Sequence, residues 1–176
     1  LLESPVCETP KGCRDKAMLE LLYATGMRVS ELLAVQIQDL NLDMNYIICR
    51  DSGKERAIPF GSAARKALLE YIGESRENLL KGGECSTLFM NCSGRPMSRQ
   101  GFWKLIKQYA RKAHIVKDIT PHTLRHSFAV HLVQNGAELK AVQEMLGHSD
   151  ISTTQMYLNM DVNCMRESYV KAHPRR

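Results

Sequence analysis

Two histidines, an arginine and a tyrosine lie close together in the last third of the chain. His122 and Arg125 are three residues apart, His148 follows in a Gly-His-Ser-Asp segment, and Tyr157 comes nine residues later. A phenol oxygen can attack a phosphodiester when cations and hydrogen-bond donors stabilise the charge on the nonbridging oxygens. Because an unperturbed phenol has a pKa of about 10, Tyr157 needs nearby cations or a base to react as phenolate. The set therefore suits phosphoryl transfer by a tyrosine nucleophile.

Arg28 adds a second guanidinium, at the junction between two expected helices, where a helix N-terminus contributes positive potential. Two arginines can hold nonbridging phosphate oxygens in a fork geometry that lysine cannot reproduce. Taken alone, Arg125 also fits a structural ion pair, with Glu31 or Asp150 as the carboxylate partner. The joint presence of the two histidines and the tyrosine favours the phosphate site.

Apolar residues at helical spacing predict that helices position most of these side chains. Within the helix after Thr120 and Pro121, a capping residue and a first-turn proline, Leu124, Phe128 and Leu132 should face the core. Gly26 suits the end of an earlier helix. The expected helices cover residues 14–25, 30–35, 63–80, 97–113, 121–134, 139–146 and 161–170, and Ser149 or Asp150 should cap the segment that carries Tyr157.

A change of pattern between residues 40 and 60 predicts a β-hairpin. Tyr46–Cys49 and Arg56–Pro59 are rich in β-prone residues, and Asp51–Lys54 between them has the composition of a turn. Thr87–Met90 is the expected third strand. The predicted fold class is mainly α with a small three-stranded β-sheet (α+β), in one domain.

Composition sets broad limits on the protein. With 176 residues, 44% of them hydrophobic, the chain is long enough for one well-buried domain and short for two. No apolar run approaches the ~20 residues that cross a bilayer, and no signal pattern opens the chain, so a cytoplasmic location is expected. The net charge of +5 only modestly favours a nucleic-acid partner. Because Leu1 is not an initiator, we interpret the chain as part of a longer protein.

The six cysteines are scattered without a C-x-x-C pair, which favours reduced, mostly structural thiols over a zinc site or a disulfide scaffold. His122 and His126 have i, i+4 spacing, but no glutamate follows His122 as a hydrolytic zinc helix requires. No metal site is predicted.

The chain resembles the tyrosine recombinase (integrase) family, closest to its Xer type. The resemblance rests on three segments: Leu19–Gly26 (LELLYATG), Leu124–Ala129 (LRHSFA) and Leu146–Thr154 (LGHSDISTT). It implies that Arg28, His122, Arg125 and His148 surround a scissile phosphate. It also implies that Tyr157 attacks this phosphate to form a 3′-phosphotyrosyl link and free a 5′-hydroxyl, without metal or ATP. Glu31 is similar to an acidic residue of the family and is expected to orient an arginine.

The hairpin departs from the family pattern. Family hairpins commonly read Gly-Lys-Gly-x-Lys-x-Arg, with the first lysine as general acid to the leaving oxygen. Here the stretch of the same length is Arg50–Arg56 (RDSGKER), so Asp51 replaces that lysine and Lys54 falls on the second one. Lys54 is the only lysine in a turn that can move, and we assign it the acid role. If Lys54 is not the acid, cleavage is slow or uses a substitute donor.

The helix expected at residues 97–113 carries the predicted DNA contacts. Arg95, Arg99 and Gln100 lie at a loop and a helix start, where phosphates bind readily. Lys104, Lys107 and Arg111 follow on one side of this helix, which equally fits a solvated face. Trp103 is expected in the core.

The resemblance also implies partners. Family members precede this domain with a core-binding domain, which is not expected within this chain, and dock a C-terminal segment, here from Asp161 onward, into a neighbouring subunit. We therefore expect a homo- or hetero-tetramer on paired double-stranded DNA sites, in chromosome-dimer resolution or in mobile-element integration or excision. The alternatives are a type IB topoisomerase, a catalytically impaired DNA-binding regulatory relative, and a helical interaction domain without a DNA role.

Overall fold

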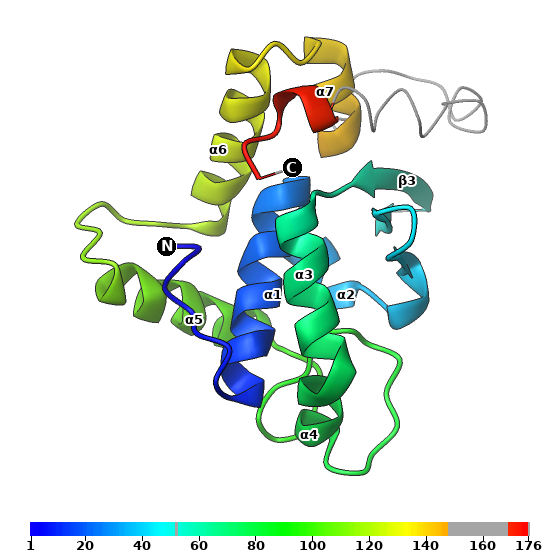
Figure 1. Ribbon diagram of the computed structural model, residues 1–176, viewed down its shortest axis with the longest axis vertical. Coiled ribbons are helices and arrows are strands. Elements are labelled where there is room, and N and C mark those ends of the chain that lie inside the picture. Colours follow the sequence, from blue (N-terminus) through cyan, green and yellow to red (C-terminus); the bar gives the residue numbers. More distant parts are fainter. Residues whose placement is uncertain (52, 148–168, 176) are drawn as a thin grey trace.

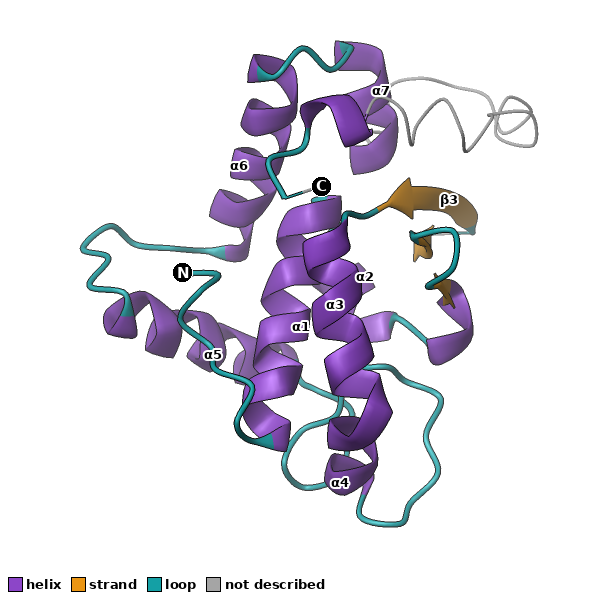
Figure 2. Ribbon diagram, viewed as in Figure 1, coloured by secondary structure: helices purple, strands orange, loops and turns teal. Residues whose placement is uncertain are grey.

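Helices form most of the molecule, and a small sheet lies at one edge (Figures 1 and 2). The computed structural model describes residues 1–51, 53–147 and 169–175. Helices α1 and α3 run side by side through the centre, with α6 and α7 above them in Figure 1. The helices are α1 (Pro10–Thr25), α2 (Val29–Ala34), 3-10 helix η1 (Ile37–Asp39), α3 (Ser62–Glu70), π-helical η2 (Tyr71–Ser75), α4 (Arg76–Leu80), α5 (Arg99–Lys112), α6 (Pro121–Gln134) and α7 (Leu139–Leu146).

Local sequence signals set the helix ends. Thr9 accepts a hydrogen bond from the Gly12 N–H (3.0 Å) and starts α1, four residues before the predicted start. Gly26 ends α1 in the left-handed conformation (φ 60°), and its N–H donates to the Leu22 carbonyl. Thr120 caps α6 through the Thr123 N–H (3.2 Å). The end of α1 at Gly26 and the start of α6 at Thr120 therefore confirm the predicted signals.

The sheet has the order β1–β2–β3, with β1 (Leu40–Asn41), β2 (Tyr46–Asp51) and β3 (Lys54–Pro59) all antiparallel. The hairpin prediction is confirmed, but the choice of Thr87–Met90 as the third strand was wrong. That segment forms only isolated bridges. A side chain satisfies part of its backbone. The buried Tyr71 hydroxyl donates to the Leu88 carbonyl (3.0 Å) and accepts from the Met90 N–H (3.1 Å).

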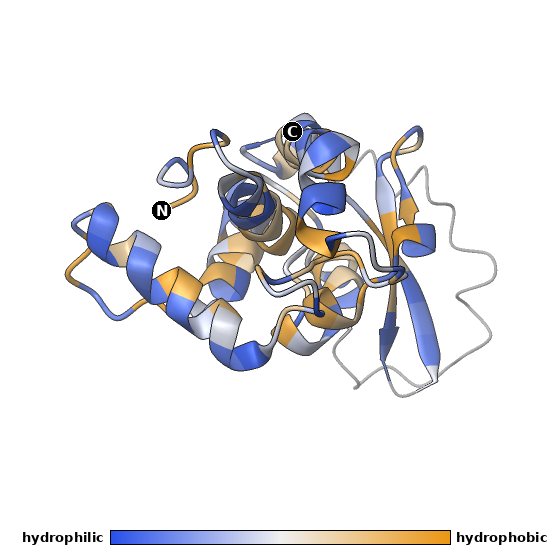
Figure 3. Cartoon of the chain, turned by 90° about the horizontal axis from the view of Figure 1, so that it is seen from below, coloured by the Kyte–Doolittle hydropathy of each residue, from blue (hydrophilic) through white to orange (hydrophobic). Residues whose placement is uncertain are grey.

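The core surrounds α1, which is buried along most of its length. The predicted apolar face of α6 packs there, since Leu124, Phe128 and Leu132 are all buried. Figure 3 shows apolar residues gathered where the helices meet, while the hairpin tip and the outer side of α5 are hydrophilic. This core fixes the first turns of α2 and α6 relative to each other. None of the described helices is long and apolar enough to cross a membrane.

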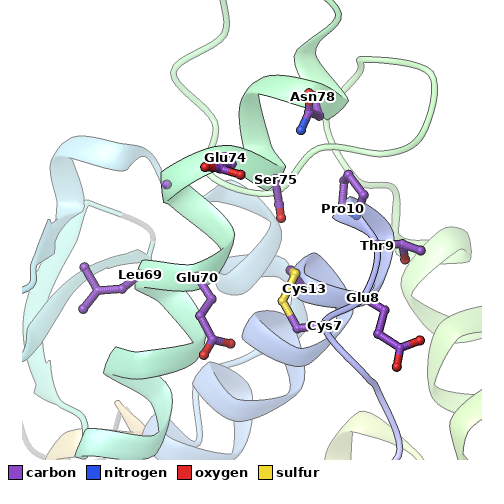
Figure 4. Close-up of a pocket in the computed structure, with 11 residues that line it drawn as sticks. Cys7, Glu8, Thr9, Pro10, Cys13, Leu69, Glu70, Glu74, Ser75 and Asn78 are labelled. Carbon is purple, nitrogen blue, oxygen red and sulfur yellow. A yellow bond between two sulfur atoms is a disulfide. The ribbon is translucent and has the colours of Figure 1, made fainter.

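The expectation that all cysteines are reduced was wrong for one pair. Cys7 and Cys13 form a disulfide, with their Cα atoms 4.2 Å apart (Figure 4). The chain folds back over the start of α1, and a Cβ at Gly12 would lie 2.0 Å from the Val6 carbonyl oxygen. Glycine at this position permits the close return that brings the two thiols together. The pair borders a cavity of about 560 Å³ that Glu8, Glu70 and Glu74 also line.

Residues 169–175 pack against their own domain, next to α1. The Tyr169 hydroxyl accepts from the Gly61 N–H (3.0 Å), and the Arg175 guanidinium binds both carboxylate oxygens of the buried Glu20 (2.6 and 2.9 Å). His173 stacks on Tyr169, with ring centroids 4.5 Å apart. The predicted docking of the segment from Asp161 into a neighbouring subunit stays a prediction, because residues 161–168 lie outside the described part of the chain.

His173 should make stability depend on pH. Its side chain is 1% exposed, and burial lowers its pKa to about 4. An unfolded chain binds a proton on this histidine below about pH 6.5. Between about pH 6.5 and about pH 4, the unfolded chain binds this proton but the folded protein does not. As pH falls through this range, the free energy of unfolding should therefore drop by about 3 kcal/mol in total. Above this window the histidine adds no pH dependence.

Urea denaturation at intervals between pH 7 and pH 4 measures this loss. In His173→Gln, the part of the slope of unfolding free energy against pH that is due to this residue should vanish. The exposed His126→Gln variant is the control and should keep the full slope. An identical pH dependence in the wild type and His173→Gln would contradict the prediction.

Candidate active site

A cavity of about 250 Å³ lies where the starts of α2, α5 and α6 meet. Arg28, His122 and Arg125, which come from two distant parts of the sequence, all line it. The full lining is Met27, Arg28, Val29, Ser30, Arg99, Trp103, Pro121, His122 and Arg125. Three of the predicted catalytic residues therefore share one cavity.

Arg125 is held by two backbone carbonyls from different elements. Its Nη1 donates to the Gly26 oxygen (2.6 Å) at the end of α1, and its Nη2 donates to the Leu146 oxygen (2.7 Å) at the end of α7. The structural alternative paired Arg125 with Glu31 or Asp150. Within the described residues Arg125 forms no ion pair, and Asp150 lies outside them.

The surroundings of Arg125 favour an anion. Burial, and then the positive charge of Arg28, lower the pKa of Arg125 to about 10. The guanidinium remains a cation at neutral pH, but one that its environment destabilises. A phosphate in the cavity would offset this cost, because guanidinium–phosphate hydrogen bonds are charge-assisted.

Arg28 precedes α2 and contacts acceptors from three elements. Its Nη1 forms an ion pair with Asp51 of β2, and its Nη2 lies 3.4 Å from the Gly147 carbonyl oxygen. The Glu31 carboxylate is 3.7 Å from Nη1 and also accepts from the Arg28 backbone N–H (2.6 Å). Since Arg28 and Asp51 are 39% and 42% exposed, their pairing is weak enough for a phosphate to replace it.

Glu31 was expected to orient an arginine, and its main partner is Arg56 of β3. The two Arg56 Nη atoms donate to the two Glu31 oxygens at 2.7 and 2.9 Å. Burial is the largest single effect and disfavours the charged guanidinium of Arg56. The hydrogen bonds to Glu31 and the negative charge of nearby acidic groups, among them Glu31 and Asp51, together raise the pKa of Arg56. Sequence reasoning missed Arg56. The strand alternation that places it on the face of Ile58 and Lys54 could have indicated it.

The hairpin register decides which side chains face the cavity region. Asp51 pairs with Lys54, and Cys49 pairs with Arg56, so these four residues share one face of the sheet. Arg50 and Glu55 lie on the other face, where Arg50 binds Glu55 (2.7 Å) and Asp39. Lys54 is exposed at the turn. It lies on the same face of the hairpin as Asp51, which forms an ion pair with Arg28.

His148 and Tyr157 lie outside the described residues. The last described residue before them is Gly147, which ends α7 with φ 65°. Of the predicted DNA contacts, Arg99 lines the cavity. Arg95 and Gln100, which are near Arg99 in the sequence, are exposed. No group of three His, Cys, Asp or Glu side chains in the described ranges could hold a metal ion.

Trp103 is the clearest error in this region, because it was expected in the core. It is 37% exposed and lines the cavity, with the Lys107 ammonium 5.6 Å from its ring centroid. On α5 the neighbours Phe102, Leu105 and Ile106 fill the core and turn Trp103 outward. A ring beside Arg99 and His122 offers the cavity an apolar wall next to its cations.

Comparison with known proteins identifies the family of this chain. The model of the phage integrase family matches residues 4–163. The chain belongs to this family. The phage integrase family match covers every predicted catalytic residue, including the two outside the described ranges.

Curated relatives from this family have similar sequences. The chain is 53% identical over 176 residues to tyrosine recombinase XerD of Halalkalibacterium halodurans and 54% identical to that of Staphylococcus saprophyticus. Each alignment covers 99% of this chain but only 59% and 60% of the relative. The chain thus spans about three fifths of the length of these relatives.

Solved structures of recombinases share the fold. The XerA recombinase crystal structure matches with a TM-score of 0.71 and 32% identity, over 93% of this chain and 60% of that one. XerH site-specific recombinase bound to its difH substrate in a pre-cleavage complex matches with a TM-score of 0.69 and 27% identity, over 92% of this chain and 43% of that one. The mainly helical fold with a three-stranded sheet is therefore that of a recombinase catalytic domain.

Proposed function

We propose that this chain is the catalytic domain of a tyrosine site-specific recombinase that cleaves and rejoins DNA strands through a covalent 3′-phosphotyrosyl intermediate. The observation that supports this most is the shared cavity of Arg28, His122 and Arg125, in a chain more than half identical to XerD recombinases. We propose as its partners a double-stranded recombination site and other recombinase subunits, in a tetramer on paired sites, in the cytoplasm.

In the proposed reaction the two arginines bind the nonbridging oxygens of the scissile phosphate and stabilise the charge that grows on them. His122 and His148 donate hydrogen bonds and transfer protons. The Tyr157 oxygen attacks phosphorus as one of these two histidines accepts its phenolic proton, and the bond to the 5′-oxygen breaks. Lys54 gives that oxygen a proton, so a 5′-hydroxyl departs. A 5′-hydroxyl of a partner strand then attacks the phosphotyrosine and restores both the tyrosine and a phosphodiester.

Bond energy is conserved in this cycle, so the proposal includes neither metal nor ATP. A catalytically impaired DNA-binding regulator is the second candidate. The observation in its favour is Asp51, a carboxylate bound to Arg28 at the hairpin position where family members carry lysine. Asp51 adds negative charge beside the phosphate site.

Covalent trapping separates these two candidates. The probe is a nicked suicide duplex, selected from a randomised library by its ability to trap the protein in a denaturation-resistant adduct. Mass spectrometry should place the adduct on the peptide that contains Tyr157, and Tyr157→Phe should form none. A protein that binds duplex DNA but yields no adduct from the library would support the regulator and overturn the proposal.

Lys54→Met should lower the rate of adduct formation by about 10²-fold, because an unprotonated 5′-oxygen is a poor leaving group. A substrate with a 5′-bridging sulfur needs no proton for departure, so it should restore most of the rate. Single-turnover gels measure both rates. Arg50→Met is the matched control on the opposite face of the hairpin, and it should change neither rate by more than about twofold.

If Lys54→Met were slow on both substrates, Lys54 would not be the proton donor. The same conclusion would follow if the variant cleaved the ordinary substrate as fast as the wild type. The first outcome would point to a role in placing the hairpin.

A further inference from the structure

Arg56 lies between two parts of the site that the sequence does not connect. On one side it binds both oxygens of Glu31, at 2.7 and 2.9 Å. On the other its Nε donates to the Met145 carbonyl oxygen (2.9 Å) in the last turn of α7. Its side chain is only 9% exposed, so both interactions are shielded from water.

Glu31 has two arginines within reach, and Arg56 is the nearer one. The Glu31 Oε1 atom lies 2.7 Å from Arg56 Nη1 and 3.7 Å from Arg28 Nη1. A buried carboxylate that loses its cationic partner is left with an uncompensated charge, which is strongly unfavourable. Without Arg56, the nearest remaining guanidinium for Glu31 would be that of Arg28, which the phosphate also requires.

Three arginines from three elements hold the end of α7 through consecutive carbonyls. Arg56 binds the Met145 oxygen, Arg125 the Leu146 oxygen, and Arg28 approaches the Gly147 oxygen at 3.4 Å. The C-terminal end of a helix carries partial negative charge, which favours cations there. Gly147 directly precedes His148 in the sequence, so this contact fixes the point from which the chain continues toward the predicted histidine and tyrosine.

Gly147 shows how closely Arg56 approaches this turn. A Cβ at Gly147 would lie 2.9 Å from Arg56 Cζ and 3.0 Å from its Nη1. The guanidinium therefore packs against the backbone itself, and the position has φ +65°, which also favours glycine.

We propose that Arg56 is a positioning residue that neutralises Glu31 and fixes the end of α7, so that Arg28 stays available to the phosphate. This inference rests on the proposed function. Arg56 acts through Glu31 and the α7 backbone, and it lies outside the lining of the cavity. This role differs from a purely structural one, because removing the charge of Glu31 should compensate for the loss of Arg56.

The test compares Arg56→Met, Arg56→Lys and the double variant Arg56→Met/Glu31→Gln. Glutamine keeps the acceptor that caps the Arg28 N–H but removes the charge that attracts the Arg28 guanidinium. Arg65→Met is the matched control, since Arg65 also donates to a backbone carbonyl, that of Leu42 at 2.9 Å. Thermal unfolding of each variant is measured in parallel.

With the selected suicide duplex at saturation, Arg56→Met should slow adduct formation by about 30- to 100-fold, because misplaced groups cost rate more than binding. Its affinity for the duplex should change by less than about threefold. Arg56→Lys, which keeps the charge and loses the fork, should fall between the wild type and Arg56→Met. The double variant should recover at least about tenfold of the lost rate.

A second probe needs no DNA site. Inorganic phosphate should shift the NMR signal of the Arg28 Nε–H in the wild type, and its apparent affinity should be about fivefold weaker in Arg56→Met and restored in the double variant. If the wild type traps no duplex, the proposed function fails while this titration still tests Arg56. Absence of a phosphate-induced shift in the wild type would overturn the inference, because Arg28 would then bind no phosphate for which Arg56 keeps it available.

Two further results would overturn it. One is an Arg56→Met variant with the wild-type adduct rate and phosphate affinity. The other is a double variant as slow as Arg56→Met, with both equally lowered in melting temperature, which would mark Arg56 as purely structural.

Discussion

Arg125→Lys is expected to lower the rate of covalent adduct formation by about 10²- to 10³-fold, the cost of losing a placed donor to the developing charge. Arg125 uses Nη1 and Nη2 to bind the Gly26 and Leu146 carbonyls. Its planar fork can meet these acceptors and still present N–H groups to a phosphate in the cavity. Lysine keeps the charge but has one compact ammonium group, so it cannot serve acceptors from two helices and the phosphate together.

Single-turnover cleavage of the selected suicide duplex measures this loss, and gel-shift titration measures the affinity for the same duplex. The affinity should fall by only about tenfold, because many other phosphate contacts hold the DNA. Arg65→Lys, far from the cavity in sequence and hydrogen-bonded to one carbonyl, is the control and should cleave like the wild type. A cleavage rate within tenfold of the wild type in Arg125→Lys would show that charge alone suffices.

Gly26→Ala is expected to destabilise the fold by about 3 to 4 kcal/mol, through backbone strain and overpacking together. Gly26 has φ +60°, and a Cβ there would lie 2.3 Å from Cδ1 and 2.8 Å from Cε1 of Phe128. Phe128 is fully buried on α6, so its ring has little room to move away. The Gly26 carbonyl also anchors Arg125, so displacement of this turn should reduce cleavage as well.

Urea denaturation gives the free energy of unfolding, and a loss of this size corresponds to a melting temperature lower by about 6–16 °C. Gly136→Ala is the matched control: its φ is also positive, at +87°, but no atom lies within 4 Å of the added Cβ. That variant should lose only about 1 to 2 kcal/mol. Equal losses in the two variants would mean that backbone strain alone, rather than contact with Phe128, explains the effect.

The errors of sequence reasoning have identifiable physical causes. Thr87–Met90 is apolar enough for a strand, but its backbone groups bond to the Tyr71 and Arg76 side chains and to separate backbone groups such as the Val35 carbonyl, not to one neighbouring strand. Trp103 fits the apolar spacing of α5, yet its neighbours fill the core and leave it at the cavity. The Cys7–Cys13 bond depends on a return of the chain over Gly12 that spacing alone does not reveal. Each case depends on which groups meet in space.

By itself the sequence determined the end of α1 at Gly26 and the start of α6 at Thr120, the approximate positions of the other described helices, and the hairpin. These features are local, because capping, glycine conformation and strand alternation act over a few residues. The predicted helix at residues 161–170 and the predicted cap of the Tyr157 segment lie largely outside the described residues. Only the tertiary structure placed Arg28, His122 and Arg125 around one cavity. It also decided that Glu31 pairs mainly with Arg56. The choice among several cations for one buried carboxylate depends on distances of a few ångströms between separate elements, because Coulomb energies and hydrogen bonds fall steeply with distance and exposure.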